Sequence, residues 1–451
     1  MCSTNIIIRT ISFIGAYAFV TLSPTALPIF AQTIPMTAVR AGHLVDVRRG
    51  QVLKDRIILI KGDRVEAILE GNAKLPGGTV VIDLSGYTVM PGLIDCHTHL
   101  VGEPQGPSPA ALLERTREEE LISGIRNANK TLMAGFTSVR DVGSQRAFVD
   151  VHLRDAINDG TIQGPRMAVA GTYITVSSGA GDFTAVAPDV VVPKDLRAGV
   201  ANNEAEVRQR VREMLNGGAD FIKIMATGAV LTKGTKPGAA EFSEAELRAS
   251  VEEAAKYGAR VTSHAHGAEG IKNAIRAGIP TIEHASLIDD EGIRLAREKG
   301  VFLSMDIYNG DYIDSEGRKQ GWPAEFLQKN LDTTEAQRQG FHKAVVAGVK
   351  VVFGTDAGVY PHGLNGRQFA YMVRYGMTPM QALQAATILA AENIGKAEIG
   401  TLEPGHYADL VAVEGDPIAN IRLLENIPFV MKGGAVVKQS KSPSTDTVTA
   451  H

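Results

Sequence analysis

The chain has 451 residues, enough for one large domain and a smaller one with a substantial core. Hydrophobic residues make up 44% of it and charged residues 21%, as in an ordinary globular protein. Its 50 acidic and 46 basic residues give a formal net charge of -4 at pH 7, and no basic cluster interrupts that balance. We therefore expect no nucleic-acid partner.

The first 31 residues have the pattern of a secretory signal peptide. Arg9 precedes an apolar stretch at residues 11–20, and two prolines and the small residue Ala31 follow. A retained membrane anchor is the alternative, but a spanning helix needs about 20 apolar residues and this stretch is shorter. We expect cleavage after Ala31 and a periplasmic or secreted mature protein with no membrane association.

Cys96 is the only cysteine left after that cleavage, because Cys2 leaves with the signal peptide. No intramolecular disulfide is then expected. Cys96 alternates with His97 along a predicted strand and so faces the opposite side. This position favours a packing role for Cys96 over that of a nucleophile.

Both ends of the chain have the pattern of short strands separated by turns. Near the N-terminus the predicted strands cover residues 38–47, 56–61, 65–69 and 79–83, and near the C-terminus residues 408–413 and 429–438, the latter a hairpin. The alternation predicts a small β-sandwich. The tail, residues 440–451, is rich in Ser and Thr without apolar periodicity, and we expect it to be disordered.

Residues 92–399 alternate apolar strands with helical patterns. Eight strand candidates begin at Leu93 and continue at residues 137–142, 166–171, 221–225, 260–264, 281–284, 301–305 and 351–354. Helical patterns such as residues 244–257 and 379–394 separate them. This alternation predicts an α/β fold, a (β/α)₈ TIM barrel, whose active site lies at the carboxyl ends of the strands. Residues 172–202 lack a helical pattern, so we expect a loop that faces the substrate.

Residues that can bind a metal lie at the ends of these strands. The run Pro91-Gly92-Leu93-Ile94-Asp95-Cys96-His97-Thr98-His99-Leu100 places two histidines on one face of a strand. Downstream are Lys223 in an apolar run, His264-Ala265-His266, Ile282-Glu283-His284 and Gly354-Thr355-Asp356. Together they supply the nitrogen and oxygen ligands that a divalent metal binds.

As a set, these motifs resemble the metal-dependent amidohydrolase superfamily. The phrases Gly218-Ala219-Asp220-Phe221-Ile222-Lys223-Ile224, His264-Ala265-His266-Gly267 and Gly376-Met377-Thr378-Pro379 are similar to the branch that holds Xaa-Pro dipeptidases, related zinc carboxypeptidases and ochratoxin-hydrolysing amidases, near the imidazolonepropionases. The resemblance covers residues 36–440. It implies that residues 32–91 and 400–439 meet in one discontinuous β domain.

The resemblance also implies a centre of two zinc ions. His97, His99 and Asp356 would hold the first ion, His264 and His284 the second, and Lys223 would bridge them. A free ammonium cannot ligate a cation, so Lys223 would carry an N6-carboxylate formed with carbon dioxide. Burial near metal ions lowers the pKa of a lysine and makes this modification feasible.

The neighbouring histidines His264 and His266 compete for one ligand position, because both can face the site. In the family, the first is the ligand and the second position contacts the scissile carbonyl. By this resemblance His266 would polarise the carbonyl oxygen. Two metal ions lower the pKa of a bridging water, and Asp356 would pass the proton of that water to the leaving nitrogen.

Four further side chains are candidates for substrate contact. Arg140, at the end of the second predicted barrel strand, could bind a substrate carboxylate or could pair internally. His362 and Asn365 follow the last barrel strand and are placed to line the pocket. Tyr308 could stack on a substrate side chain or could pack beneath its loop.

The chain departs from the family pattern at one position. Many relatives carry a histidine in a Gly-Gly-His-Gly-Asp run after the third strand, whereas Ser178-Gly179-Ala180-Gly181-Asp182 stands here. The missing histidine puts dipeptide or proline specificity in doubt. The smaller Ala180 indicates room for a bulkier acyl group.

These patterns predict a binuclear zinc amidohydrolase that cleaves the amide between an acyl or aminoacyl group and an L-amino acid. Ochratoxin A-type phenylalanine amides are expected among its small-molecule or short peptide-like substrates. The alternatives are an Xaa-Pro dipeptidase, a cyclic-amide or imidazolone hydrolase, and a lactonase or phosphotriesterase on the same centre. A barrel that serves only as a scaffold is disfavoured, because all six ligand positions are filled. By resemblance we also expect a homo-oligomer.

Overall fold

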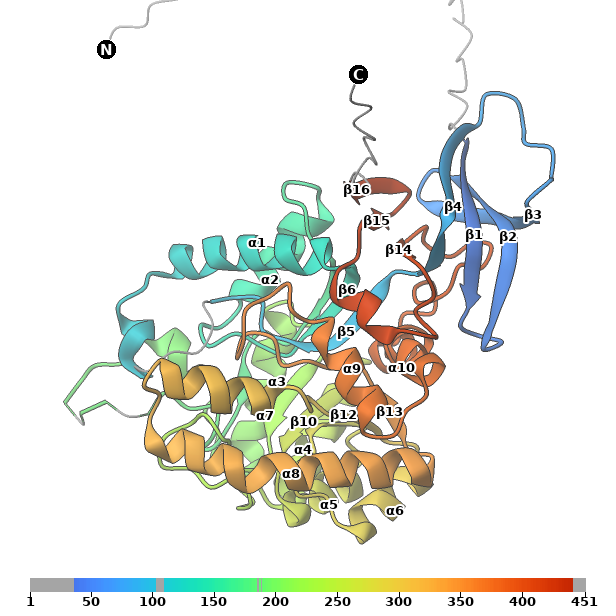
Figure 1. The fold of residues 1–451 in the computed structure, drawn as a ribbon. Helices are drawn as coiled ribbons and strands as arrows, with labels where there is room; N and C mark the ends of the chain where they lie inside the picture. Colours follow the sequence, from blue (N-terminus) through green and yellow to red (C-terminus); the bar gives the residue numbers. More distant parts are fainter. Residues whose placement is uncertain (1–35, 103–108, 185, 188, 441–451) are drawn as a thin grey trace, which may run out of the picture. The chain divides into compact units, whose positions relative to one another are not determined.

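Strands from both ends of the chain meet in one sheet (Figure 1). The computed structural model describes residues 36–102, 109–184, 186–187 and 189–440. The predicted signal peptide lies outside the described residues, as do residues 441–451 of the predicted tail. Within the described residues, no helix combines the length and the apolar character needed to cross a membrane.

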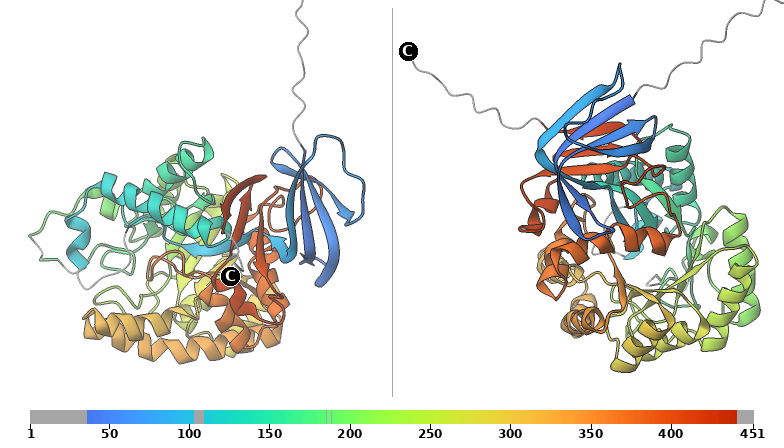
Figure 2. Two further views of the ribbon diagram at one scale, coloured as in Figure 1. Left: turned by 45° about the horizontal axis from the view of Figure 1, so that its top comes forward. Right: turned by 90° about the vertical axis from the view of Figure 1, so that its right-hand side faces the viewer.

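The sheet contains seven strands. In spatial order they are β16 (Ala435–Gln439), β15 (Phe429–Lys432), β14 (Leu410–Glu414), β4 (Val80–Pro91), β1 (Met36–Asp46), β2 (Gln51–Lys61) and β3 (Arg64–Glu70). Strand β4 pairs in parallel with β1 and antiparallel with β14, so it joins the two ends of the chain. The right-hand view of Figure 2 shows the first strands in blue beside the last ones in red.

The strands predicted to form a small β-sandwich hydrogen-bond in a single continuous sheet. The continuity depends on β4, which has 12 residues and pairs with β1 at residues 80–84 and 88–89 and with β14 at residues 87–91. The sheet also curls, since the Val65 N–H donates to the His406 carbonyl at 2.9 Å. The two halves therefore share one apolar core, in which Ile58 lies with Phe429.

The remaining strands are parallel and alternate with helices. One sheet contains β5 (Leu93–Thr98), β6 (Phe136–Asp141) and β7 (Arg166–Val169), and the other contains, in spatial order, β13 (Lys350–Val352), β12 (Phe302–Ser304), β11 (Thr281–His284), β10 (Val261–Ala265), β9 (Ile222–Met225) and β8 (Tyr173–Ile174). The predicted third strand corresponds to β7, whereas β8 lies at the start of the segment predicted as a loop, and the two short strands pair with different neighbours. The break includes Gly171, whose φ is +79°.

Backbone hydrogen bonds link these two parallel sheets at both margins. On one side the Asp220 N–H donates to the Val169 carbonyl at 2.8 Å. On the other side the Cys96 N–H donates to Phe353 and the Asp356 N–H to His97, both at 2.8 Å. The second margin brings the end of β5 beside the residues that follow β13.

The helices are α1 (Arg117–Met133), α2 (Val149–Asn158), α3 (Glu204–Asn216), α4 (Glu244–Ala255), α5 (Ala268–Ala277), α6 (Asp290–Lys299), α7 (Asn309–Tyr312), α8 (Ala324–Ala347), α9 (Arg367–Arg374), α10 (Pro379–Ala385) and α11 (Ile388–Ile394). Short 3₁₀ turns are η1 (Pro109–Leu113), η2 (Lys194–Arg197) and η4 (Ile421–Glu425), and η3 (Ile313–Gly317) is a π turn. Capping boxes begin α1 at Thr116, α4 at Ser243 and α10 at Thr378.

The helix predicted at residues 379–394 is interrupted between α10 and α11. At the end of α10, the carbonyl groups of Ala385 and Ala386 accept hydrogen bonds from the Phe353 and Ile94 N–H groups. These bonds tie the helix end to the parallel strands. Thr387 then leaves the helical conformation, with a φ of -136° and a ψ of -96°.

Three buried phenylalanines stack in the main hydrophobic core. The ring centroids of Phe136 and Phe353 are 5.3 Å apart, and those of Phe353 and Phe369 are 4.4 Å apart. None of the three side chains is exposed. Since they come from β6, from the segment after β13 and from α9, they join parts of the chain that are distant in sequence.

We predict that Phe136→Ala lowers the free energy of unfolding by about 3–5 kcal/mol, because it leaves a cavity that the fixed neighbouring rings cannot fill. Urea denaturation measures the change. Val346→Ala on α8 is the control, since that side chain is 73% exposed and its loss should change stability by no more than about 0.5 kcal/mol. Equal effects of the two substitutions would contradict the core position of Phe136.

Candidate metal centre

Five of the six predicted ligands lie near or just beyond the carboxyl ends of parallel strands, and Lys223 lies within its strand. His97 and His99 come from the end of β5, Lys223 from β9, His264 from β10, His284 from the last residue of β11, and Asp356 from the segment after β13. Together with His266 they line one cavity of about 190 Å³. The structure therefore brings together every residue that the sequence predicted to bind metal or to polarise the carbonyl.

The first cluster consists of His97, His99 and Asp356. The Oδ1 atom of Asp356 is 3.4 Å from His97 Nε2 and 3.3 Å from His99 Nε2. Within the described part of the chain, His97 Nε2 is buried and has no hydrogen-bond partner. A buried nitrogen without a partner is costly unless something else binds it. A metal ion at this point would supply that partner, so these residues fit the ion that the sequence implies.

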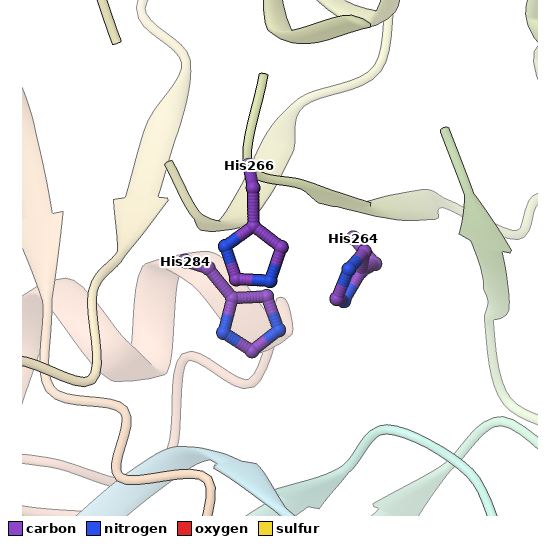
Figure 3. A group of neighbouring side chains, drawn as sticks. All are labelled: His264, His266 and His284. Atoms are coloured by element: carbon purple, nitrogen blue, oxygen red, sulfur yellow. The ribbon is translucent and has the colours of Figure 1, made fainter. Parts of the chain in front are cut away.

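The second cluster consists of His264, His266 and His284 (Figure 3). The ring centroids of His264 and His284 are 4.5 Å apart, and the rings of His266 and His284 are stacked at 4.7 Å. His284 also belongs to a third group with Asp306 and Asp356. The two clusters are therefore neighbours, linked through His284 and the two carboxylates.

The backbone at these positions adopts a left-handed conformation. His284, Ala285 and Asp356 have φ values of 67°, 49° and 57°. Residues other than glycine adopt such values rarely and at a cost, often at functional sites. Two of these three residues, His284 and Asp356, line the cavity.

Each of the five histidines has one ring nitrogen that hydrogen-bonds to a group outside the two clusters. The kind of partner indicates whether that nitrogen carries a proton. Four rings have a partner that can only accept: His97 Nδ1 with Glu283 Oε2 at 2.9 Å, His99 Nδ1 with the Gly143 carbonyl at 2.7 Å, His264 Nε2 with the Gly228 carbonyl at 3.3 Å, and His284 Nδ1 with Asp306 Oδ1 at 2.9 Å. In each ring the bonded nitrogen must be an N–H, so in the neutral ring the lone pair is on the other nitrogen. These four rings are the four histidines predicted as ligands.

The fifth ring, His266, differs in its partner. Its Nδ1 atom lies 2.8 Å from the Ser286 hydroxyl, which can either donate or accept. The position of the proton on His266 is thus not imposed by an acceptor.

A buried ion pair between Arg140 and Glu283 lies next to His97 of the first cluster. Burial opposes ionisation of Glu283, but the charges of Arg140 and His97 hold its pKa well below the usual range. Arg140 Nη2 donates to Glu283 Oε1 at 2.5 Å, and Arg140 Nε donates to the Cys96 carbonyl at 2.7 Å. Arg140 does not line the cavity, so of the two roles left open by the sequence the structure has internal pairing and not substrate binding.

Three other predicted substrate contacts also lie away from the cavity lining. His362 Nε2 hydrogen-bonds the His99 carbonyl at 3.0 Å. Asn365 donates to the buried Asp95 carboxylate at 2.8 Å. Tyr308 packs in a cluster of tyrosine rings. In this structure each of these side chains contacts residues of β5 or of the loops beyond the strands, and substrate contact by them stays a prediction.

Lys223 is buried in the middle of β9, with 2% of its surface exposed. Among the described residues its ammonium has no hydrogen bond and no ion pair with a side chain. Burial lowers the pKa of Lys223 to about 8, because the ammonium is removed from water. A substantial fraction of the side chain is therefore neutral near pH 8.

Sequence reasoning missed Asp306 and Glu283. Asp306 follows β12 by two residues, as the predicted ligands follow their strands, and that position was a usable signal. Glu283 stands inside the motif that yielded His284, but nothing in the sequence indicated its partner. Asn309 was also missed, and its Nδ2 atom donates to Asp306 and to Asp356 Oδ2, both at 3.0 Å.

The cavity has a group of apolar lining residues and a group of polar ones. Ala180 lies in the apolar group with Met225, Ala229 and Val230. The polar group includes Asn330, Thr333, Thr334 and Gln337, which share one face of α8. Ala180 is held in place by its N–H, which donates to Glu241 Oε2 at 2.9 Å.

Residues 88–438 match the sequence profile of the amidohydrolase family. The chain belongs to the amidohydrolase family. It is a hydrolase that acts on amide bonds. The ochratoxinase of Aspergillus niger is 32% identical over 428 residues, which cover 89% of this chain and 87% of that protein.

Two solved structures extend this likeness to the amidohydrolase fold. A Xaa-Pro dipeptidase with methionine bound in its active site is 37% identical, with a TM-score of 0.84, and the match covers 89% of this chain and 100% of that one. A prolidase in complex with N-methylphosphonate-L-proline is 30% identical, with a TM-score of 0.83, and the match covers 90% and 100%. The likeness thus includes both ends of the described chain and not the parallel strands alone.

We predict that Arg140→Gln destabilises this amidohydrolase by about 3–5 kcal/mol, because the Glu283 carboxylate is left buried without its cation. Thermal and urea unfolding measure the effect. Arg294→Gln is the matched control, since that arginine is 56% exposed and its i,i+4 pair with Glu298 should contribute only about 0.3–0.5 kcal/mol. If Arg140→Gln instead raised KM and left stability unchanged, Arg140 would be a substrate ligand.

Proposed function

We propose that this protein is a binuclear zinc amidohydrolase, built on a (β/α)₈ barrel, that cleaves the amide between an acyl or aminoacyl group and an L-amino acid. One observation carries the proposal of a metal centre. Four of the five histidines in the cavity have acceptor-only partners, so each of them in its neutral form has its lone pair on the other ring nitrogen, where a metal ion can bind it. Second partners of this kind are usual for histidines that bind metal.

His97, His99 and Asp356 would hold one ion, and His264 and His284 the other. The buried His97 Nε2 supports the first site, because among the described residues it has no hydrogen bond and faces the Asp356 carboxylate. Lys223, as its N6-carboxylate, would bridge the two ions. Its burial, its lack of a partner among the described residues and its lowered pKa support this role, because carbon dioxide reacts with the neutral amine.

Two bound metal ions would supply a water of lowered pKa at neutral pH. The remaining steps belong to side chains of this chain. His266 would donate from Nε2 to the carbonyl oxygen as negative charge develops on it. Asp356 would take a proton from the water and deliver it to the leaving nitrogen. The Asn309 amide, which donates to Asp356 Oδ2, would keep Oδ1 directed at His97 and His99.

For the substrate, we propose aromatic acyl amides of L-amino acids, with ochratoxin A-type phenylalanine amides among them. The 32% identity to an ochratoxinase supports this class. So does the apolar lining around Ala180, which has no histidine to narrow it. Xaa-Pro dipeptides are the second candidate, because a solved Xaa-Pro dipeptidase is 37% identical to this chain.

A panel of substrates tests the function directly. Purified zinc-loaded protein would be assayed with N-acyl amino acids, dipeptides, ochratoxin A and an aryl lactone of similar size. Release of the free amino acid from the amides is the expected result. Turnover of the lactone alone would overturn the proposal of amide hydrolysis.

One prediction concerns the metal centre. We expect about two zinc ions per chain by elemental analysis, and Lys223→Ala should lose both zinc and measurable turnover, because no other residue can bridge the two sites. Short carboxylic acids should restore part of the activity by replacing the carbamate. Lys343→Ala, at a 58% exposed surface lysine, is the control and should keep both properties. Full turnover of metal-free protein would end the proposal.

Another prediction concerns the residues that line the cavity. We expect a higher kcat/KM for ochratoxin A than for a Xaa-Pro dipeptide, because Ala180 leaves space for a large acyl group. Ala180→His should reduce turnover of ochratoxin A about tenfold or more and that of the dipeptide less. Ala180→Val separates added bulk from the imidazole. A preference of the unmodified enzyme for Xaa-Pro dipeptides would replace this substrate class with the dipeptidase function.

A further inference from the structure

Ser286 lies two residues beyond β11 and is buried, with 2% of its surface exposed. Its hydroxyl has one hydrogen-bond partner among the described residues, the Nδ1 atom of His266 at 2.8 Å. Buried hydroxyl protons in proteins nearly always have an acceptor. The only acceptor that the described residues offer this proton is the lone pair of His266 Nδ1.

We propose that Ser286 is a positioning residue that fixes the tautomer of His266. The Ser286 hydroxyl donates to Nδ1, and the single proton of the neutral ring therefore stays on Nε2. In Figure 3 the ring nitrogen of His266 farther from its chain attachment points toward the space between His264 and His284. The inference rests on the proposed function, in which this N–H donates to the scissile carbonyl.

The opposite tautomer would make His266 a metal ligand. Its Nδ1–H would then donate to Ser286, and the Ser286 proton would lose its acceptor among the described residues, which is unfavourable in a buried site. The other four rings have carboxylate or carbonyl partners, which impose a lone pair on the second nitrogen. The hydroxyl partner thus distinguishes His266, the proposed hydrogen-bond donor to the carbonyl, from the four histidines proposed as metal ligands.

Substitution of Ser286 tests the role in turnover. Ser286→Ala should lower kcat about 10–100-fold, the usual cost of losing such a supporting contact. KM and zinc content should stay close to their original values, and Ser286→Thr should restore turnover because it keeps the hydroxyl. Ser304→Ala is the matched control, since Ser304 is buried beside β12 and does not line the cavity. Loss of zinc in Ser286→Ala would overturn the proposal.

A double substitution shows whether Ser286 acts through His266. In a His266→Ala background, Ser286→Ala should cause no further loss of kcat, because the ring that it positions is already absent. The same loss in both backgrounds would mean that Ser286 acts on something else, and the proposal would fail.

Nitrogen NMR of metal-free protein with ¹⁵N-labelled histidine measures the tautomer without substrate or zinc. The His266 signals are identified by their absence in His266→Ala. We expect the Nε2–H form in the unmodified protein and in Ser286→Thr, and a mixture of forms in Ser286→Ala. An Nδ1–H form of His266 in the unmodified protein would overturn the proposal. Failure of the enzyme to cleave amides would overturn the proposed function and leave this measurement valid.

Discussion

Five imidazole rings lie close to one another, four of them buried and His99 partly exposed, and each directs one ring nitrogen toward the cavity. Neighbouring centroids are 4.5 to 5.4 Å apart, so the rings share the same small volume. Protonation of all five rings together would be strongly repulsive. Burial lowers the pKa of His266 to about 3 and that of His264 well below the usual range, whereas burial at His97 is outweighed by the charges of Asp356 and Glu283, which raise its pKa to about 9. The surrounding structure therefore has to supply a hydrogen-bond partner for the ring nitrogen of each histidine that faces away from the cavity.

That requirement explains several features that otherwise look unrelated. The Glu283 and Asp306 carboxylates accept from His97 and His284, and the carbonyls of Gly143 and Gly228 accept from His99 and His264. Glu283 needs a cation of its own in such a buried place, and Arg140 supplies it. Part of the polar interior of the parallel strands therefore exists to orient rings and does not contact substrate.

The sequence was informative about ligands because their chemistry is local. His97 and His99 are two residues apart on one strand, and His284 and Asp356 close short apolar runs, so spacing alone indicated a shared face and a shared edge. The strand β11 was predicted at its observed bounds for the same reason. The alternation of strands and helices likewise indicated the α/β part of the fold.

The partners of those ligands were not predictable, because they depend on contacts between distant segments. Arg140 and Glu283 are 143 residues apart, and nothing in either segment identifies the other. His362 and Asn365 occupy loops after the last strand, where sequence cannot separate a residue that faces the cavity from one that supports it. The continuous seven-stranded sheet escaped prediction because β4 was expected to end near residue 83, whereas it extends to Pro91.

The direct passage from β4 into β5 has a consequence for how the protein is made. Only Gly92 separates the two strands, and its N–H donates to the Asp409 carbonyl, while the next residues bond to Gly135 and Ala386. The strand β5 can pair with β6 soon after it is synthesised, yet its hydrogen bonds to Phe353 and Ala386 require segments that are made much later. Such long-range pairing slows folding. During synthesis this strand remains incomplete until the end of the chain is available, so the metal-binding end of the protein matures late.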